Sequence, residues 1–317
     1  MKTLRENVTD YLATRRVLGF KLEGLSKLLW SFVEFCEQRG ATRVQNDLAI
    51  LWATTPIKVP VNDALIARRL DAVRVFARYQ HALDPLTQIP VEEHRPRRYR
   101  PKQPNILSQD DICALLAATS ILEPGFKALT WRTLIGLLAA TGLRPGEACR
   151  LAVSDLDLAG GVIQVLETKF GKSRLVFIHP STVTVLADYL QARRAWAGAS
   201  THTSATVFLN TRGAPICPDR LNVTFRQIVA AAGLATAPGH RPVRLHDLRH
   251  TFAVTTMIAW YRDGHDVQAR LPLLSTWLGH VDPASTYWYL HTVPELLTLA
   301  ADRLDNTGEA PAAKPVP

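Results

Sequence analysis

A proline-rich segment about a third of the way along the chain constrains the fold more than any other feature of the sequence. Five prolines fall within it: Pro85, Pro90, Pro96, Pro101 and Pro104. Proline fixes φ and lacks an N–H, so the segment cannot continue a helix and favours an extended, semi-rigid backbone. The 317 residues are therefore expected to form a domain over 1–88, a linker over 89–104 and a second domain over 105–305. The Pro/Ala-rich residues 306–317 are expected to be a disordered tail.

The part before the linker has the hydrophobic pattern of helices. Apolar residues recur at intervals of three and four, which predicts an amphipathic helix or helix pair over residues 11–38. The expected inward residues are Leu18, Leu22, Leu25, Leu28, Leu29, Phe32, Phe35 and Cys36. A second helix is expected over residues 62–82, and no strand signal precedes Pro90. This part is therefore expected to be a small all-helical domain.

Beyond the linker the hydrophobic period changes. Ser108 with Asp111 predicts a helix start, and further helices are expected over residues 126–141, 181–196, 218–232 and 246–261. Short helices are expected from Pro272 and from Pro294. Two apolar runs, 162–165 and 175–178, flank a polar turn and predict a β-hairpin. The expected fold class is mainly α with a small β-hairpin or sheet (α+β).

The charge distribution points to a polyanionic partner. The formal net charge is +9, and residues 1–103 hold 18 basic and 11 acidic side chains. Such asymmetry favours binding to nucleic acid, although a solubilising surface is an alternative. The linker concentrates basic residues around Tyr99, which favours a strap along a nucleic-acid backbone. These residues are Arg95, Arg97, Arg98, Arg100 and Lys102.

Other features bear on the cellular location. No apolar run approaches the roughly 18 residues that a membrane-spanning helix needs. Residues 1–10 are polar and mixed in charge, and the four cysteines lie far apart without a CxxC pair. We expect a soluble, cytoplasmic protein without a membrane partner, a disulfide framework or a cysteine-based zinc site.

Five places carry residues suited to chemistry. They are Arg144 with Glu147 three residues later, Lys169 in the hairpin turn, His246 with Arg249 one turn apart on a helix, His280, and Tyr289. Taken singly, each has a plain structural reading, such as a surface ion pair or a turn lysine. His246, His250 and His280 also suggest a metal site, but the cation of Arg249 beside them would repel the metal. No metal or cofactor is expected.

Taken together, these residues suit metal-free attack on a phosphodiester. Two arginines can hold the non-bridging oxygens and offset developing charge. A tyrosine can serve as the nucleophile and form a phosphotyrosine. A lysine on the hairpin can protonate the leaving oxygen, and a histidine can take the tyrosine proton.

The sequence resembles the tyrosine recombinases, the phage-integrase and Xer-like enzymes. The motifs ATGLRPGE, TKFGKSR, RLHDLRHTFA, LGH and STYWY occur in the family's order and near its spacings. The resemblance implies a core-binding domain followed by a catalytic domain, and a 3′-phosphotyrosyl mechanism without metal or ATP. It implies catalytic roles, with Glu147 in support, for Arg144, Lys169, His246, Arg249, His280 and Tyr289.

Further details of the motifs qualify the resemblance. The interval from LGH favours Tyr289 over Tyr287 as the nucleophile, and His250 is expected to pack or cap rather than react. Residues 262–266 form an apparent insertion relative to the compact family pattern, expected as an extended helix and loop. The stretch from Asp266 is similar to recombinases of mobile elements, which suggests integration or transposition.

The implied partners are double-stranded DNA and further copies of the chain. The resemblance implies a homo-tetramer on two DNA sites, with sister recombinases as an alternative composition. Further expected DNA contacts are Arg68, Arg74, Lys172 and Arg174. Three rival functions are a type IB topoisomerase-like nicking and closing enzyme, a non-catalytic accessory DNA-binding protein and a metal-dependent nuclease.

Overall fold

The computed structural model describes residues 2–20, 22–57, 60–91, 104–166, 173–198, 204–234, 236, 241–280, 282 and 284–306. The chain divides into two compact units, residues 1–101 and 102–317, and the division falls inside the predicted linker. Several predicted residues lie outside the described ranges, as do the tail residues 307–317. They are Arg95, Arg97, Arg98, Arg100, Lys102, Lys169 and Lys172.

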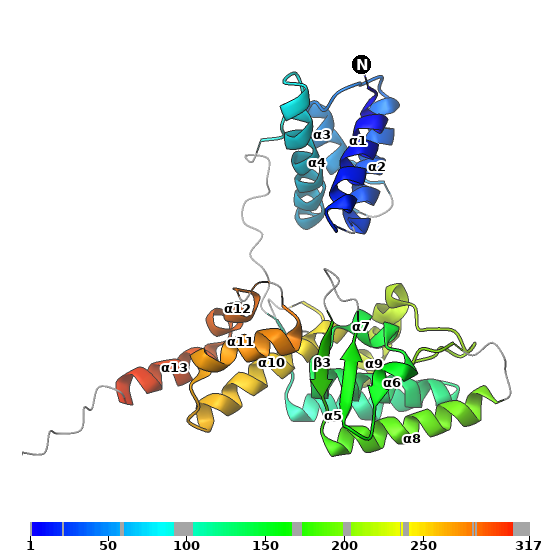
Figure 1. Cartoon of the computed structure of the whole chain (residues 1–317), viewed down its shortest axis with the longest axis vertical. Helices are drawn as coiled ribbons and strands as arrows, with labels where there is room; N and C mark the ends of the chain where they lie inside the picture. The colour runs from blue at the N-terminus through cyan, green and yellow to red at the C-terminus, as the bar shows by residue number, and fades with distance from the viewer. Residues whose placement is uncertain are drawn as a thin grey trace, which may run out of the picture. The chain divides into compact units, whose positions relative to one another are not determined.

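The described part of the N-terminal unit is a bundle of four helices. They are α1 (Leu4–Val17), α2 (Glu23–Glu37), α3 (Asn46–Thr54) and α4 (Asp63–Leu83) (Figure 1). Thr3 begins α1 with a capping box, and the Asn62 side chain accepts from Leu65 N at 2.9 Å at the start of α4. Aromatic side chains that include Phe32, Trp52 and Phe76 fill the bundle interior.

The helical character of the N-terminal unit was predicted correctly, but one inward-facing residue and one helix were not. Residues 11–38 form a helix pair, because α1 ends at Val17 and Gly19 turns the chain with φ +85°. The prediction that Leu18 points inward is wrong, since it is 64% exposed in that turn. Helix α3 was not predicted.

The second unit contains most of the secondary structure. Its α-helices are α5 (Gln109–Ala118), α6 (Gly125–Thr141), α7 (Pro145–Arg150), α8 (Pro180–Ala197), α9 (Leu221–Ala231), α10 (Leu245–Arg262), α11 (Val267–Leu278), α12 (Ala284–Thr292) and α13 (Pro294–Asn306). Short 3₁₀ turns cover Thr119–Ile121, Val153–Asp155 and Pro218–Arg220. Figure 1 shows α10 to α13 gathered at one end of this unit.

A small antiparallel sheet interrupts the helices. Strands β1 (Leu156–Asp157), β2 (Val162–Val165) and β3 (Arg174–Phe177) pair in the order β1-β2-β3. In the β2–β3 hairpin Val162 lies opposite Phe177 and Val165 opposite Arg174. The hairpin and the fold class, mainly helical with a small sheet, are therefore confirmed, while β1 was not predicted.

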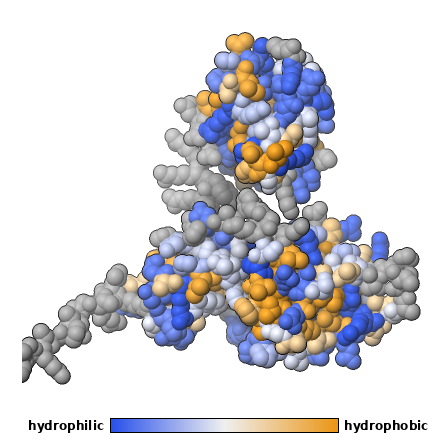
Figure 2. Space-filling model, viewed as in Figure 1, coloured by the Kyte–Doolittle hydropathy of each residue, from blue (hydrophilic) through white to orange (hydrophobic). Residues whose placement is uncertain are grey.

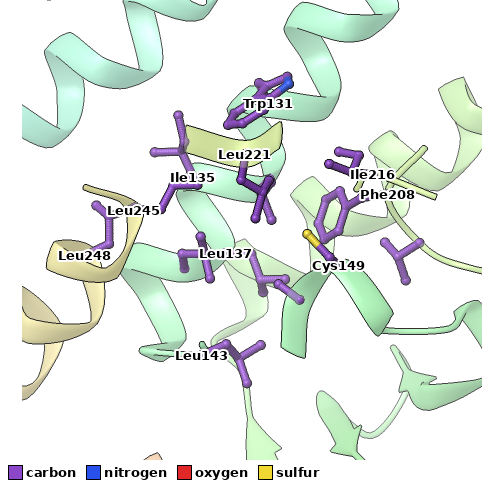
Figure 3. Packing of buried hydrophobic residues seen from close by; sticks show 14 of the residues in the cluster. Trp131, Ile135, Leu137, Leu143, Cys149, Phe208, Ile216, Leu221, Leu245 and Leu248 are labelled. Atoms are coloured by element: carbon purple, nitrogen blue, oxygen red, sulfur yellow. The ribbon is translucent and has the colours of Figure 1, made fainter. Parts of the chain in front are cut away.

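Helix α6 is the central element of the second unit. Its side chains Leu134, Ile135 and Leu138 are fully buried, and the helix packs against α8 and α10. Figure 3 shows Trp131, Ile135 and Leu137 of this helix among apolar side chains from α7, α9, α10 and the intervening chain. Because α6 is fixed on several sides, the turn that follows its C-terminus is fixed as well.

The insertion and the helix that follows it were predicted only in part. As expected, α10 extends to Arg262 and a loop follows. The prediction that the next helix begins at Pro272 is wrong, because α11 begins at Val267 with the Asp266 side chain accepting from Ala269 N at 3.1 Å. Pro272 therefore lies inside the helix.

Exposed apolar side chains gather over the small sheet. Figure 2 shows this hydrophobic region on the face in view. Its contributors include Leu175 and Phe177 of the edge strand β3, which are 55% and 61% exposed. Among the described residues, no helix is both long and apolar enough to cross a bilayer.

Candidate active site

The turn after α6 places Arg144 beside Glu147. Helix α6 ends at Thr141, and the C-cap residue Gly142 has a φ of +65°, the left-handed conformation common at helix C-termini. Pro145 then starts α7, with Arg144 at its N-cap. Glu147 accepts hydrogen bonds from the Arg144 backbone N at 3.0 Å and from its Nη1 at 2.7 Å.

Arg174 of β3 shares the same carboxylate. Its Nη2 donates to Glu147 Oε2 at 2.8 Å, and only 9% of its side chain is exposed. Burial alone would raise the pKa of Glu147, but hydrogen bonds and charge from Arg174 and Arg144 lower it to about 2. Arg174, predicted as a DNA contact, therefore lies inside the site and supports Glu147 in this structure.

Arg249 of α10 is the most deeply buried of the three arginines, at 1% exposure. It donates to the Gly142 carbonyl from Nη1 at 2.9 Å and to the Leu278 carbonyl from Nη2 at 2.7 Å. Burial, followed by the charge of Arg144, lowers its pKa to about 9. Among the described residues, three guanidiniums thus surround the carboxylate of Glu147, which leaves this group with an excess of positive charge.

The C-terminal end of α11 joins all three arginines. Its last carbonyls lack partners within the helix and carry partial negative charge. The carbonyls of Trp277, Leu278 and Gly279 accept, in that order, from Arg174 Nε at 2.7 Å, Arg249 Nη2 at 2.7 Å and Arg144 Nη2 at 2.8 Å. Three arginines from three distant parts of the chain are therefore fixed by three consecutive peptide groups.

Three histidines lie beside the arginines. Burial, followed by the charge of Arg249, lowers the pKa of both His246 and His280 to about 4. Burial and the neighbouring His246 lower the pKa of His250 to about 3. All three imidazoles are therefore neutral near neutral pH, when they can accept hydrogen bonds. Nδ1 of His280 lies 2.7 Å from the Thr286 hydroxyl.

Tyr289 of α12 enters the same cluster. Its side chain is 2% exposed, and its hydroxyl lies 2.8 Å from Nδ1 of His250. Burial raises the pKa of Tyr289 to about 12, against the lowering effects of Arg249 and Arg144. Tyr287, two residues earlier, is 38% exposed. The structure therefore brings Tyr289 together with Arg144, Arg249 and the histidines.

Asp247 is a residue of the site region that the motif analysis passed over. It is fully buried and accepts from both terminal nitrogens of Arg241 and from the Arg244 backbone N at 2.8 Å. Asn105 Nδ2 donates to it at 3.1 Å. The start of α10 is thus tied to the chain that enters the unit. The sequence signal for Asp247 was its position between His246 and Arg249 on the predicted helix.

Two further predicted residues, Arg68 and Arg74, belong to α4 of the N-terminal unit. Arg68 is exposed on α4. Arg74 is 3% exposed and donates to Asp71 and to the carbonyls of Pro90 and Val91, so the prediction that it contacts DNA is not supported by this geometry. Within the described ranges, no three His, Cys, Asp or Glu side chains are grouped to hold a metal ion.

The arrangement suits a phosphate group bound beside a phenol. Buried guanidiniums form strong, often bidentate hydrogen bonds with phosphate oxygens, and an incoming anion would neutralise the excess positive charge. Neutral imidazoles nearby can accept or relay a proton. The site therefore combines an anion clamp, proton acceptors and a potential nucleophile.

Comparisons with known proteins agree in sequence and in fold. Residues 105–295 match the model of the phage integrase family. A candidate integrase/recombinase of Sinorhizobium fredii, y4rB, is 39% identical over 98% of this chain and 99% of its own. The tyrosine recombinase XerC of Lactobacillus delbrueckii subsp. bulgaricus is 29% identical over 94% of this chain and 97% of its own.

Solved structures share the fold at lower identity. The Tn1549 transposon integrase in complex with circular intermediate DNA aligns with a TM-score of 0.68 and 17% identity, over 96% of this chain and 100% of that one. A lambda integrase dimer bound to a core site aligns with a TM-score of 0.60 and 18% identity, over 89% of this chain and 96% of that one.

Proposed function

Because the chain belongs to the phage integrase family of tyrosine recombinases, we propose that it is a site-specific DNA recombinase that cuts and rejoins strands through a 3′-phosphotyrosyl intermediate. The observation that carries the mechanism is the burial of Tyr289 in the cluster that holds Arg144 and Arg249. The tyrosine nucleophile therefore lies beside the arginines that would bind the phosphate it attacks.

The residues that the family motifs single out have the following roles in the proposed reaction. Arg144 and Arg249 hold the non-bridging oxygens of the scissile phosphate and stabilise the charge that develops on them. Glu147 fixes the Arg144 guanidinium. His246 and His280, neutral at the clamp, donate or accept hydrogen bonds at the phosphate. Lys169, outside the described residues, is assigned as the general acid from its motif alone.

The proposed reaction requires neither metal nor ATP. The Tyr289 oxygen attacks phosphorus, and the 5′ oxygen of the next nucleotide leaves as a hydroxyl. The phosphotyrosine keeps the energy of the broken ester, so a 5′-hydroxyl from a second duplex can reverse the step and join a new strand. The arginines supply the electrostatic stabilisation that a metal ion provides in other phosphoryl-transfer sites.

The proposed partner is double-stranded DNA, bound by a tetramer of this chain on two sites. The net charge of +9 favours a polyanion, and the structural neighbours described above include complexes with DNA. The resemblance of the stretch from Asp266 to recombinases of mobile elements favours a mobile element as the source of the target DNA.

The decisive experiment uses nicked suicide duplexes built from the DNA that flanks this gene's element. Wild type, Tyr289→Phe and Tyr287→Phe are each incubated with the duplex in EDTA and run on a denaturing gel. We expect a covalent protein–DNA band with wild type and Tyr287→Phe, and none with Tyr289→Phe. Tyr287→Phe is a matched control because it removes the same hydroxyl two residues away.

Other outcomes would change the assignment. Loss of the band with Tyr287→Phe alone would move the nucleophile to Tyr287. Cleavage that EDTA abolishes would indicate a metal-dependent nuclease, and tight binding without any covalent band would indicate an accessory DNA-binding protein. Relaxation of supercoiled DNA without site preference would indicate a topoisomerase-like enzyme.

A further inference from the structure

His250 is positioned to act on the nucleophile itself, although its place in the sequence suggested only packing. It lies on α10 one turn after His246, and its Nδ1 is 2.8 Å from the Tyr289 hydroxyl. The two rings meet edge to face, with centroids 5.5 Å apart. This contact joins α10 to α12 at the atom that the proposed function makes reactive.

The surroundings of His250 keep its imidazole neutral. His246 presents its ring edge-on to His250, with centroids 4.7 Å apart and an interplanar angle of 89°. Burial, followed by the neighbouring His246, Arg241, Arg249 and His280, lowers the pKa of His250 to about 3, so its ring is neutral near neutral pH. In the neutral tautomer that carries its proton on Nε2, Nδ1 accepts the hydrogen bond that the Tyr289 hydroxyl donates.

We propose that His250 is the general base that takes the Tyr289 proton during strand cleavage. The Oη–H bond breaks and its proton moves to Nδ1 of His250, while the Oη electron pair forms the new bond to phosphorus. The bond from phosphorus to the 5′ oxygen breaks, and that oxygen takes a proton from the general acid assigned to Lys169. The inference rests on the proposed strand-transfer function and adds a residue to it.

The negative charge of the bound phosphate gives this transfer its direction. In the protein alone, burial and then the neighbouring His246 and arginines oppose a charged His250, and burial raises the Tyr289 pKa to about 12. A phosphate held by Arg144 and Arg249 offsets those cations and stabilises an imidazolium. Proton transfer is therefore coupled to occupancy of the clamp, and the tyrosine stays protonated without DNA.

The test measures single-turnover cleavage as a function of pH for wild type, His250→Asn and His250→Gln. The duplex carries sulfur in place of the 5′ bridging oxygen, because a thiolate leaves without a general acid and Lys169 then does not shape the profile. Asparagine places an amide at the position of Nδ1 but cannot take a proton. His81→Asn, an exposed histidine in the other unit, is the matched control.

We expect His250→Asn to bind DNA normally and to cleave about 10²–10⁴-fold more slowly near neutral pH. Its rate should rise about tenfold per pH unit, because hydroxide then makes the phenolate that His250 no longer makes. Wild type and His81→Asn should stay nearly flat over that range. The charged and titratable groups around the pair are His246, Asp247, Arg249, Arg241, His280 and Arg144.

Three outcomes would overturn the inference. If His250→Asn cleaves at the wild-type rate, His250 is not the general base. If its cleavage rate is reduced by the same factor at every pH, His250 has only a structural role. If wild type itself forms no covalent product, the strand-transfer function fails and this inference fails with it. His250→Gln, which retains more of the side-chain volume, gives the same readout if His250→Asn does not fold.

Discussion

At the scale of single residues, Glu147 is the group on which the site depends most. Both Arg144 and Arg174 contact its carboxylate, and its side chain is 3% exposed. Removing one partner of a buried ion pair leaves the other charge without compensation, which costs more than the pair contributes. The ATGLRPGE motif identified Arg144 and Glu147, but the spacing could not reveal that Arg174 from the hairpin completes the cluster.

The depressed pKa of Glu147 makes a specific contribution to the pH dependence of stability. The pKa of Glu147 is about 2 in the folded protein, against an ordinary value of 4.5 for a glutamate. The stabilisation that this difference provides is therefore fully present above pH 4.5 and is lost as the pH falls toward 2. We expect this acid-labile part, on the order of 3 kcal/mol, to be absent from Glu147→Gln. Urea unfolding of both proteins at a series of acidic pH values measures the difference.

The control is a substitution of an exposed acid, for which Asp110→Asn at the start of α5 is suitable. Its free energy of unfolding should follow the wild-type pH dependence. Parallel curves for wild type and Glu147→Gln would contradict the assigned pKa, whatever the absolute stability of the variant.

At the scale of elements, the sequence predicted most of the helices and the hairpin, because hydrophobic period and capping residues are local signals. The start of α11 at Val267 was not predicted, since a proline commonly marks the first turn of a helix, whereas here Asp266 caps the helix and Pro272 lies inside it. The contact between His250 and Tyr289 could not be read from the sequence either. It depends on how α10 and α12 approach, which no local pattern encodes.

The turn that ends α11 gives a prediction at this scale. Gly279 has φ +67°, and a Cβ there would lie 2.8 Å from Arg174 Nη1; Gly264 has φ +75° with open space around it. Alanine at either position should cost about 1–2 kcal/mol for the left-handed backbone. Gly279→Ala should cost more than Gly264→Ala and also lower the cleavage rate, because Arg174 must shift.

Thermal unfolding and suicide-duplex cleavage of the two variants provide the comparison. Gly264→Ala controls for the backbone conformation. Equal stability losses with equal cleavage rates would mean that Arg174 moves at no cost and that its position does not matter to the site.

At the scale of the whole molecule, the chain has separate hydrophobic interiors. The cluster around Phe32 and Trp52 belongs to the N-terminal unit, and the clusters around Leu138 and Val254 belong to the second. The expectation of two domains rested on the proline-rich segment, because prolines exclude a continuous helix. The sequence alone could not give the helix packing within each unit, which depends on shape complementarity between side chains.

Separate interiors predict separate responses to core substitutions. Phe32 and Leu138 are both fully buried, and truncation to alanine should cost about 2–5 kcal/mol at either site. Phe32→Ala should lower the melting temperature of the N-terminal unit only, and Leu138→Ala that of the second unit only. Calorimetry of the full chain resolves these effects, and one transition that both variants shift equally would contradict independent unfolding.

The end of α11 also limits how the chain can change in length. Residues added in the loop between Arg262 and Val267 lie before the helix and leave its last three carbonyls facing the same arginines. A residue added or removed between Val267 and Gly279 would turn that end by about 100° and move it by about 1.5 Å, breaking all three contacts together. The loop between Arg262 and Val267 can therefore vary in length, whereas the number of residues from Val267 to Gly279 cannot change without breaking these contacts.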